Sequence, residues 1–133
     1  MRSALTLLAP AALAACAAAP APSPASDTAS TDGIARAGLN QRVYVDGPYV
    51  TPLEVLEDSR CPADVQCIRA GLVRLKLRID LGSRSETREI ASFKPIEIAD
   101  GQLSLVEVHP GRLRDRPVKP EEYRFGFRFA GGL

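Results

Sequence analysis

Apolar and polar side chains alternate along much of the chain beyond residue 40. The alternation is clearest at residues 73–81, where valine, leucine and isoleucine alternate with charged residues, and at 123–129, where tyrosine and phenylalanine alternate with arginine and glycine. A period of two predicts strands with one buried face and one face in water. The same pattern predicts shorter strands at 41–46, 51–58, 86–92, 96–98 and 103–108.

Turn signals separate these predicted strands. Gly47-Pro48 and Asp100-Gly101 mark two turns, and residues 82–85 predict a hairpin between the strands on either side. The sequence has no long segment with a helical period, and 11 prolines interrupt it, so one turn of helix is expected at most, over residues 34–40. About seven strands of this kind predict an all-β fold. We expect a small antiparallel β-sandwich, with a β-barrel as the alternative.

The first residues follow a different pattern. Met1-Arg2 gives a positive start, and residues 4–12 form an almost uninterrupted apolar run. The run is too short to span a bilayer, which takes about 20 residues, and small residues follow it, so residues 1–15 predict a secretory signal peptide. The sequence Leu13-Ala14-Ala15-Cys16 resembles the lipobox of bacterial lipoproteins. The alternative is an ordinary signal peptide that is cleaved near Ala19.

The lipobox resemblance implies that Cys16 becomes the first mature residue and carries the lipid anchor. By the rule of that family, Ala17 in place of aspartate favours the outer membrane of the bacterial envelope, with the protein facing the periplasm. Residues 16–33 contain almost only alanine, proline, serine and threonine after the cysteine, and are predicted to form a disordered tether. Residues 34–133 are enough for a single β domain and too few for two.

Three cysteines are an odd number for an exported protein. If lipid consumes Cys16, then Cys61 and Cys67 remain to form a disulfide in an oxidising compartment. Their spacing is wider than the Cys-x-x-Cys of redox pairs. A metal site is the alternative, but only His109 could join them as a soft ligand, and a carboxylate would have to complete the set. No metal or cofactor is therefore predicted.

The stretch around the two cysteines is the least generic part of the chain. Asp58 could pair with Arg60 or accept backbone N–H groups of the turn, and Gly71 is expected to adopt a conformation barred to other residues. We interpret these three residues as a structural turn, with a recognition loop as the alternative. The pattern Asp-x-Arg-Cys-Pro at 58–62, followed by Cys67 and Gly71, resembles the signature of a family of small exported bacterial proteins, many of them lipoproteins. That resemblance extends to residues 105–110 and 122–124, and it implies a β-rich exported domain without assigning an activity.

The segment 109–122 is expected to be a loop, because prolines interrupt it at three positions. It is rich in basic side chains, namely Arg112, Arg114, Arg116 and Lys119. Such a loop could bind an anionic lipid or polymer. The alternative is a solvated connection between two sheets, in which Leu113 and Val118 pack on the core.

The sequence contains no motif of nucleophilic, metal-dependent or phosphate-binding enzymes, and its one histidine, His109, precedes a proline at a predicted strand end. A formal net charge of +1 argues against a nucleic-acid partner, which favours a strongly basic chain. We therefore expect a lipid-anchored envelope protein that acts as a non-catalytic binding or accessory module. Its expected partner is an envelope protein or an anionic polymer or lipid. An envelope hydrolase is the alternative, and a metal-handling lipoprotein a weaker one.

Overall fold

A computed structural model describes residues 31–132, which form two antiparallel sheets. This part of the chain contains eight strands and one short 3-10 helix. In chain order they are β1 (Ala35–Ala37), β2 (Val43–Tyr44), β3 (Tyr49–Asp58), β4 (Val73–Leu81), β5 (Arg84–Ala91), β6 (Ile96–Ile98), β7 (Gly101–His109), η1 (Pro120–Glu122) and β8 (Arg124–Gly131). Within these residues, no helix has the length and hydrophobicity that a membrane span requires.

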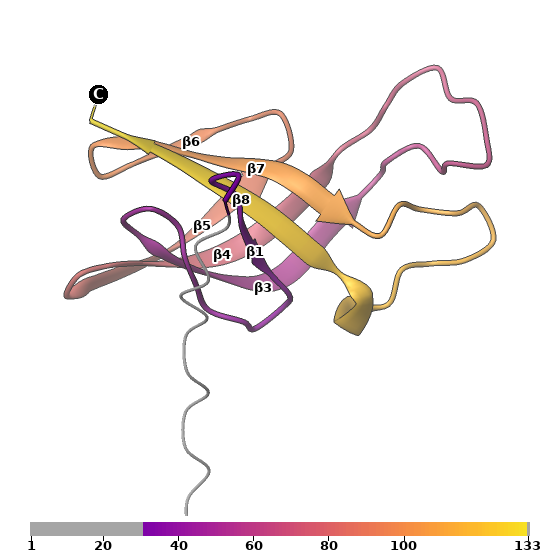
Figure 1. Ribbon diagram of the computed structural model, residues 1–133. Helices are drawn as coiled ribbons and strands as arrows, with labels where there is room; N and C mark the ends of the chain where they lie inside the picture. Colours follow the sequence, from indigo (N-terminus) through magenta and orange to yellow (C-terminus); the bar gives the residue numbers. More distant parts are fainter. Residues whose placement is uncertain (1–30, 133) are drawn as a thin grey trace, which may run out of the picture.

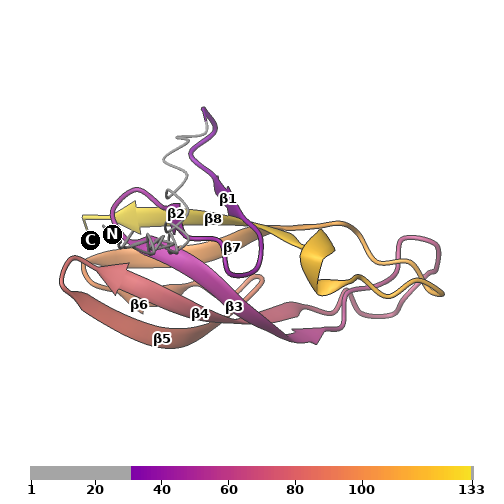
Figure 2. The ribbon, with the colours of Figure 1, turned by 90° about the horizontal axis from the view of Figure 1, so that it is seen from below.

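Each sheet has four strands. One sheet has the order β2-β3-β4-β5 and the other the order β1-β8-β7-β6. The two sheets lie face to face as the layers of a sandwich (Figures 1 and 2). The predicted β-sandwich is thus confirmed, and the alternative of a closed barrel is wrong. Chain order and spatial order agree in the first sheet only, because β8 returns to lie between β7 and β1.

The core contains the residues that the alternation pattern predicts. In β4, the side chains of Val73, Leu75, Leu77 and Ile79 are fully buried. Their charged neighbours face outward and form cross-strand ion pairs, such as that of Lys76 with Glu54 at 3.1 Å. Buried Phe125 and Phe127 of β8 face these residues from the other sheet. Each such side chain contributes roughly 1.5–3 kcal/mol by leaving water, and this burial holds the two sheets together.

Gly126 differs from its neighbours on the outer face of β8, because it is buried rather than exposed. Arg36 of β1 and Glu107 of β7 are both in register with Gly126, and the arginine Nε lies 2.9 Å from Oε2 of the glutamate. A Cβ atom at Gly126 would lie 2.9 Å from the Glu107 Cβ. The glycine therefore leaves room for an ion pair that joins β1 to β7 across β8.

Several short elements differ from the sequence-based expectations. The helical turn expected at 34–40 is wrong, because β1 lies there and buries Ala35 and Ala37 against β8. The strand expected at 41–46 shrinks to β2, since Asp46 leaves the extended conformation with a φ of 53°. The β4–β5 hairpin turns on Gly82-Ser83 alone, and β5 begins two residues earlier than expected. The left-handed conformation of Gly82, with a φ of 61°, permits that tight turn.

Two long loops extend from the same end of the sandwich. They are the disulfide loop at 59–72, between β3 and β4, and the basic loop at 110–119, between β7 and η1. Both views show them side by side, at the end opposite the β4–β5 hairpin (Figures 1 and 2). The sequence-predicted site residues of the described chain are therefore gathered at one end of the domain.

Candidate functional site

A disulfide between Cys61 and Cys67 closes the loop that leaves β3, as predicted, with the two Cα atoms 5.9 Å apart. At the base of the loop, two backbone hydrogen bonds of 2.9 Å, from Ser59 N to Leu72 O and from Cys61 N to Ala70 O, continue the pairing of β3 with β4. Neither bridged sulfur is available as a thiolate metal ligand. Across residues 31–132, no group of three or more His, Cys, Asp or Glu side chains could hold a metal ion.

Gly71 occupies a position in this loop that only glycine fits. Its φ is 68°, in the left-handed region that other residues disfavour. A Cβ atom there would lie 1.8 Å from the backbone oxygen of Ser59. The two backbone segments at the base of the loop are therefore in contact, which fixes the direction in which the disulfide loop leaves the sheet.

Asp58 and Arg60 form an ion pair at the end of β3. Arg60 donates from Nε to Oδ1 and from Nη2 to Oδ2 of Asp58, both at 2.8 Å, and the Tyr123 hydroxyl donates to the same Oδ2. Burial opposes ionisation of Asp58, but the hydrogen bonds from Arg60 and Tyr123 outweigh it, so the pKa of the carboxyl lies below its usual value. At neutral pH the Asp58 carboxylate is therefore charged and held by fixed donors, so it stabilises the end of β3.

Arg60 also connects the disulfide loop to the opposite sheet. Its Nη1 donates to the backbone oxygens of Val108 at 3.1 Å and Pro110 at 3.0 Å, at the end of β7. Its own backbone oxygen accepts a hydrogen bond of 2.8 Å from Nη1 of Arg112. The Arg60 side chain thus bonds to acceptors at the end of β3, near the end of β7 and at the start of the basic loop. We call this arrangement of Asp58, Arg60 and Tyr123 with the disulfide the corner.

The four basic side chains of the loop at 110–119 are in different situations. Arg112 is partly buried and bonded to the corner, and Arg116 forms an ion pair of 2.7 Å with Glu122. The side chains of Arg114 and Lys119 are exposed, although Arg114 N donates to Asp64 of the disulfide loop at 2.9 Å.

The two apolar residues that were expected to pack on the core also differ. Val118 packs against the core, whereas the side chain of Leu113 is 43% exposed. The loop is therefore attached to the corner by polar contacts, and its later part, at Val118, packs against the core through apolar contacts.

His109 is exposed at the end of β7, and its Nε2 lies 3.8 Å from Oε2 of Glu107. The Glu107 carboxylate is held by Arg36, and that hydrogen bond lowers the pKa of Glu107 despite some desolvation. A carboxylate that is ionised and bonded to a guanidinium is a weak general base, because its basicity is reduced. The pair therefore does not resemble the activated base of a hydrolase.

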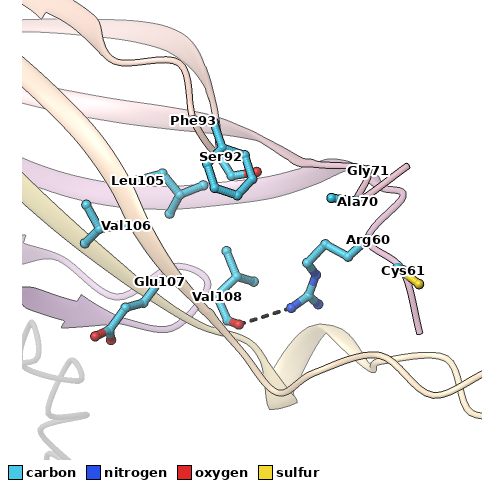
Figure 3. Close-up of a pocket in the computed structure, with 10 residues that line it drawn as sticks. All are labelled: Arg60, Cys61, Ala70, Gly71, Ser92, Phe93, Leu105, Val106, Glu107 and Val108. Carbon is cyan, nitrogen blue, oxygen red and sulfur yellow. Dashed lines mark hydrogen bonds between the residues drawn. The ribbon is translucent and has the colours of Figure 1, made fainter. Parts of the chain in front are cut away.

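A surface pocket of about 310 Å³ lies beside β7. Its wall comes from three places, namely the corner, the β5–β6 turn and the second half of β7 (Figure 3). The lining is mostly apolar, with Arg60 and Cys61 toward one end, Val106 and Glu107 toward the other, and Phe93 between them on the side of Ser92. The residues that line it are Arg60, Cys61, Ala70, Gly71, Ser92, Phe93, Leu105, Val106, Glu107 and Val108.

Phe93 is a residue of this pocket that sequence reasoning missed. The residue is 85% exposed, and its φ of 66° is rare for a bulky side chain. Such a backbone conformation costs roughly 1–2 kcal/mol. Because the side chain is largely exposed, the free energy gained by its burial offsets little of that cost. The detectable signal in the sequence was an aromatic residue between Ser92 and Lys94-Pro95, where a turn favours polar side chains.

Cys16, the residue expected to carry lipid, lies outside the described residues. A scan against protein-family models finds no match to this chain, and searches of curated proteins and of solved structures find no match either.

Proposed function

We propose that this chain is a lipid-anchored protein of the bacterial cell envelope that acts as a non-catalytic binding module, with the pocket beside β7 as its contact surface. The observation that carries the proposal is the pocket itself, an apolar hollow of about 310 Å³ with the strained and exposed Phe93 at its rim. Pockets that bind ligands are concave, mostly apolar and contain a few fixed polar groups. Arg60 is such a group here, because its guanidinium is held by Asp58.

The shape of the pocket depends on the corner. The disulfide, Gly71 and the Arg60 contacts fix one wall, and β7 supplies another. A rigid wall lowers the entropic cost of binding because few side chains have to be ordered when the partner arrives. The structural turn at Asp58, Arg60 and Gly71 thus contributes to binding by fixing the shape of the pocket. This contribution does not require every residue of the turn to contact the partner.

The envelope location is supported by the N-terminal pattern and by the disulfide. Disulfides persist in exported proteins and are rare in the reducing cytosol. The multiple acyl chains that the lipobox resemblance implies would give stable anchoring, whereas one chain holds only marginally. Replacing Cys16 with serine should move the protein from the membrane fraction to the soluble periplasmic fraction. If the variant still sediments with outer membranes, the anchor at Cys16 is wrong.

The binding role is tested by photo-crosslinking in intact cells. A photoreactive amino acid at position 93 should capture a partner, because this side chain projects from the pocket rim. The same amino acid at Thr87, which is exposed on β5 and does not line the pocket, is the matched control. Equal adducts at the two positions, or none at position 93, would contradict a binding role for the pocket.

A second candidate contact is the basic loop, with an anionic lipid or polymer as its ligand. The exposed side chains of Arg114 and Lys119 favour it, whereas Arg112 and Arg116 have structural partners. The double variant Arg114→Glu/Lys119→Glu should weaken binding to vesicles that contain anionic phospholipid. The control, Arg84→Glu/Arg128→Glu, changes the charge equally at two other exposed positions. Equal binding by both variants would exclude the loop.

A further inference from the structure

The outer edge of β7 is open along the pocket. Strand β6 pairs with β7 only from Gly101 to Leu103, whereas β8 pairs with β7 on the other side along almost its whole length. Among the described residues, no strand pairs with the outer edge from Ser104 to His109. Backbone N–H and C=O groups on such an edge are free to bond with another extended chain. Within residues 31–132, Arg60 donates to the Val108 oxygen of this stretch.

A bulge makes this edge apolar. The register of β7 against β8 shifts between Leu105 and Glu107, so that Val106 is the extra residue. Bulges change the direction of a side chain, and the Val106 side chain is 41% exposed and lines the pocket. The open edge of β5 differs, because charged residues cover it from Arg84 to Glu89. Charges of that kind discourage edge pairing, and they are missing from the Ser104–Val106 stretch of β7.

Two exposed cations adjoin, in the sequence, residues that line the pocket. Arg69 precedes the lining residue Ala70 on the disulfide loop, and Lys94 follows Phe93 on the β5–β6 turn. Both are exposed, and within residues 31–132 neither side chain forms a hydrogen bond or an ion pair. The two charged residues that line the pocket already have ion-pair partners: Arg60 pairs with Asp58, and Glu107 pairs with Arg36, which also pairs with Asp32. Arg69 and Lys94 therefore add two positive charges next to residues that line the pocket, and such charges are complementary to acidic side chains of a partner.

We infer that the partner is a protein segment that binds in an extended conformation as an added strand along the outer edge of β7, with an apolar side chain in the pocket and acidic residues facing Arg69 and Lys94. This inference rests on the proposed function of the pocket. Strand addition takes its affinity from main-chain hydrogen bonds and its specificity from pockets for alternate side chains. The open edge and the adjacent pocket supply both requirements.

The dimensions favour a peptide over a lipid or a small molecule. A cavity of about 310 Å³ lies at the lower end of the range for pockets that enclose whole ligands, and it suits one or two side chains of a larger partner. A lipid would use the apolar lining and the two cations, but it has no peptide groups to pair with the backbone of β7. Only a polypeptide uses the open edge of β7, the apolar pocket and the two cations together.

The test uses the purified full chain and synthetic peptides of about ten residues, the length of a long strand. A peptide of alternating glutamate and valine should bind, and it should slow amide hydrogen exchange in the stretch from Ser104 to Val108. An alternating lysine–valine peptide should bind about tenfold more weakly or worse, because its charge is reversed. A glutamate–valine peptide with alternate N-methylated amides should not bind, since it lacks the donors that pair with an edge.

Two variants complete the experiment. Arg69→Glu/Lys94→Glu should weaken binding of the glutamate–valine peptide about tenfold, whereas Arg84→Glu/Arg128→Glu should leave it within about twofold. Unchanged exchange between Ser104 and Val108, or equal binding of the N-methylated peptide, overturns strand addition. If either result accompanies specific capture at position 93 in cells, the binding role of the pocket stands and only the added strand is wrong.

Discussion

The Tyr123 hydroxyl donates a hydrogen bond of 2.8 Å to Oδ2 of Asp58. Tyr123 directly precedes β8 in one sheet, and Asp58 ends β3 in the other. The bond therefore joins the two layers of the sandwich at the end where both long loops begin. It also leaves the Asp58 carboxylate with donors from two directions, because Arg60 bonds to both oxygens. Tyr123 is buried and stacks on Phe125 with ring centroids 5.4 Å apart, so the core holds the hydroxyl in place.

Removal of that hydroxyl should destabilise the domain at neutral pH. Hydrogen bonds to charged groups contribute about 1.5–3 kcal/mol, and the ring of Tyr123→Phe would still pack on Phe125. We expect the free energy of unfolding to fall by about 1–2 kcal/mol. Urea unfolding of the wild-type protein and the variant measures the difference. Equal midpoints and slopes would mean that solvent replaces the bond without loss.

The same bond predicts how stability responds to high pH. Burial and the hydrogen bond to Asp58 raise the pKa of Tyr123 from 10.0 to about 12. A group whose pKa is raised in the folded state stabilises it fully below the unfolded value, and the contribution is lost as the pH rises through the folded value. The stability of the wild-type protein should therefore decrease between pH 10.0 and about 12. The decrease should be smaller in Tyr123→Phe, and parallel pH profiles would refute this assignment.

The disulfide should contribute about 2 kcal/mol, because the loop that it closes is short. The double variant Cys61→Ser/Cys67→Ser removes the bridge and leaves no unpaired thiol in the described chain. Its melting temperature should be lower by several degrees, which a thermal unfolding curve would show. Alkylation of the exported wild-type protein without a reductant provides the control, since a bridged pair takes up no reagent. Free thiols at both positions would refute the bridge in the cell.

Gly71 and Gly82 have similar backbone conformations but different surroundings. Substituting each one with alanine therefore separates the cost of the backbone conformation from the cost of steric overlap. Gly71 has a φ of 68° and Gly82 a φ of 61°, but a Cβ atom meets Ser59 O at 1.8 Å in the first case and nothing within 4 Å in the second. Gly82→Ala should cost about 1 kcal/mol for the conformation alone, whereas Gly71→Ala should cost more than about 2 kcal/mol. Chemical denaturation of the two variants gives both values. Equal losses would mean that the base of the disulfide loop adjusts easily.

Sequence reasoning succeeded where the determining pattern is local and long. The segments 73–81 and 123–129 each alternate over seven or more residues, and burial of one face follows from that alternation. The disulfide was predictable from the number of cysteines and the predicted export signal. Strand β1 was missed because it has three residues and exists through pairing with β8, far away in the chain. A segment that short has no detectable period of its own.

The corner was only half predictable for the same reason. Pairing of Asp58 with Arg60, two positions apart, was a reasonable expectation from the sequence. The bonds from Arg60 to Val108 and Pro110 connect residues 48 and 50 positions apart, and the strand order that brings them together cannot be read from one sequence. The open edge of β7 and its bulge likewise depend on which strands become neighbours. The pocket therefore appeared only with the fold.

Phe93 provides the sharpest contrast between stability and binding. The residue is 85% exposed and its φ is 66°, so the folded domain gains little from burial of the side chain and bears a conformational cost. Asparagine tolerates this conformation better, and Phe93→Asn should leave the free energy of unfolding unchanged or raise it by about 1 kcal/mol. The matched control is Ala99→Asn, at an exposed residue with a φ of 49°, which should show the same relief without loss of a ring. Urea unfolding measures both variants, and crosslinking from Val106 in the Phe93→Asn background measures the loss of partner capture. If Phe93→Asn instead destabilises the domain by more than about 1 kcal/mol while Ala99→Asn does not, the ring serves the fold itself and is not reserved for a partner.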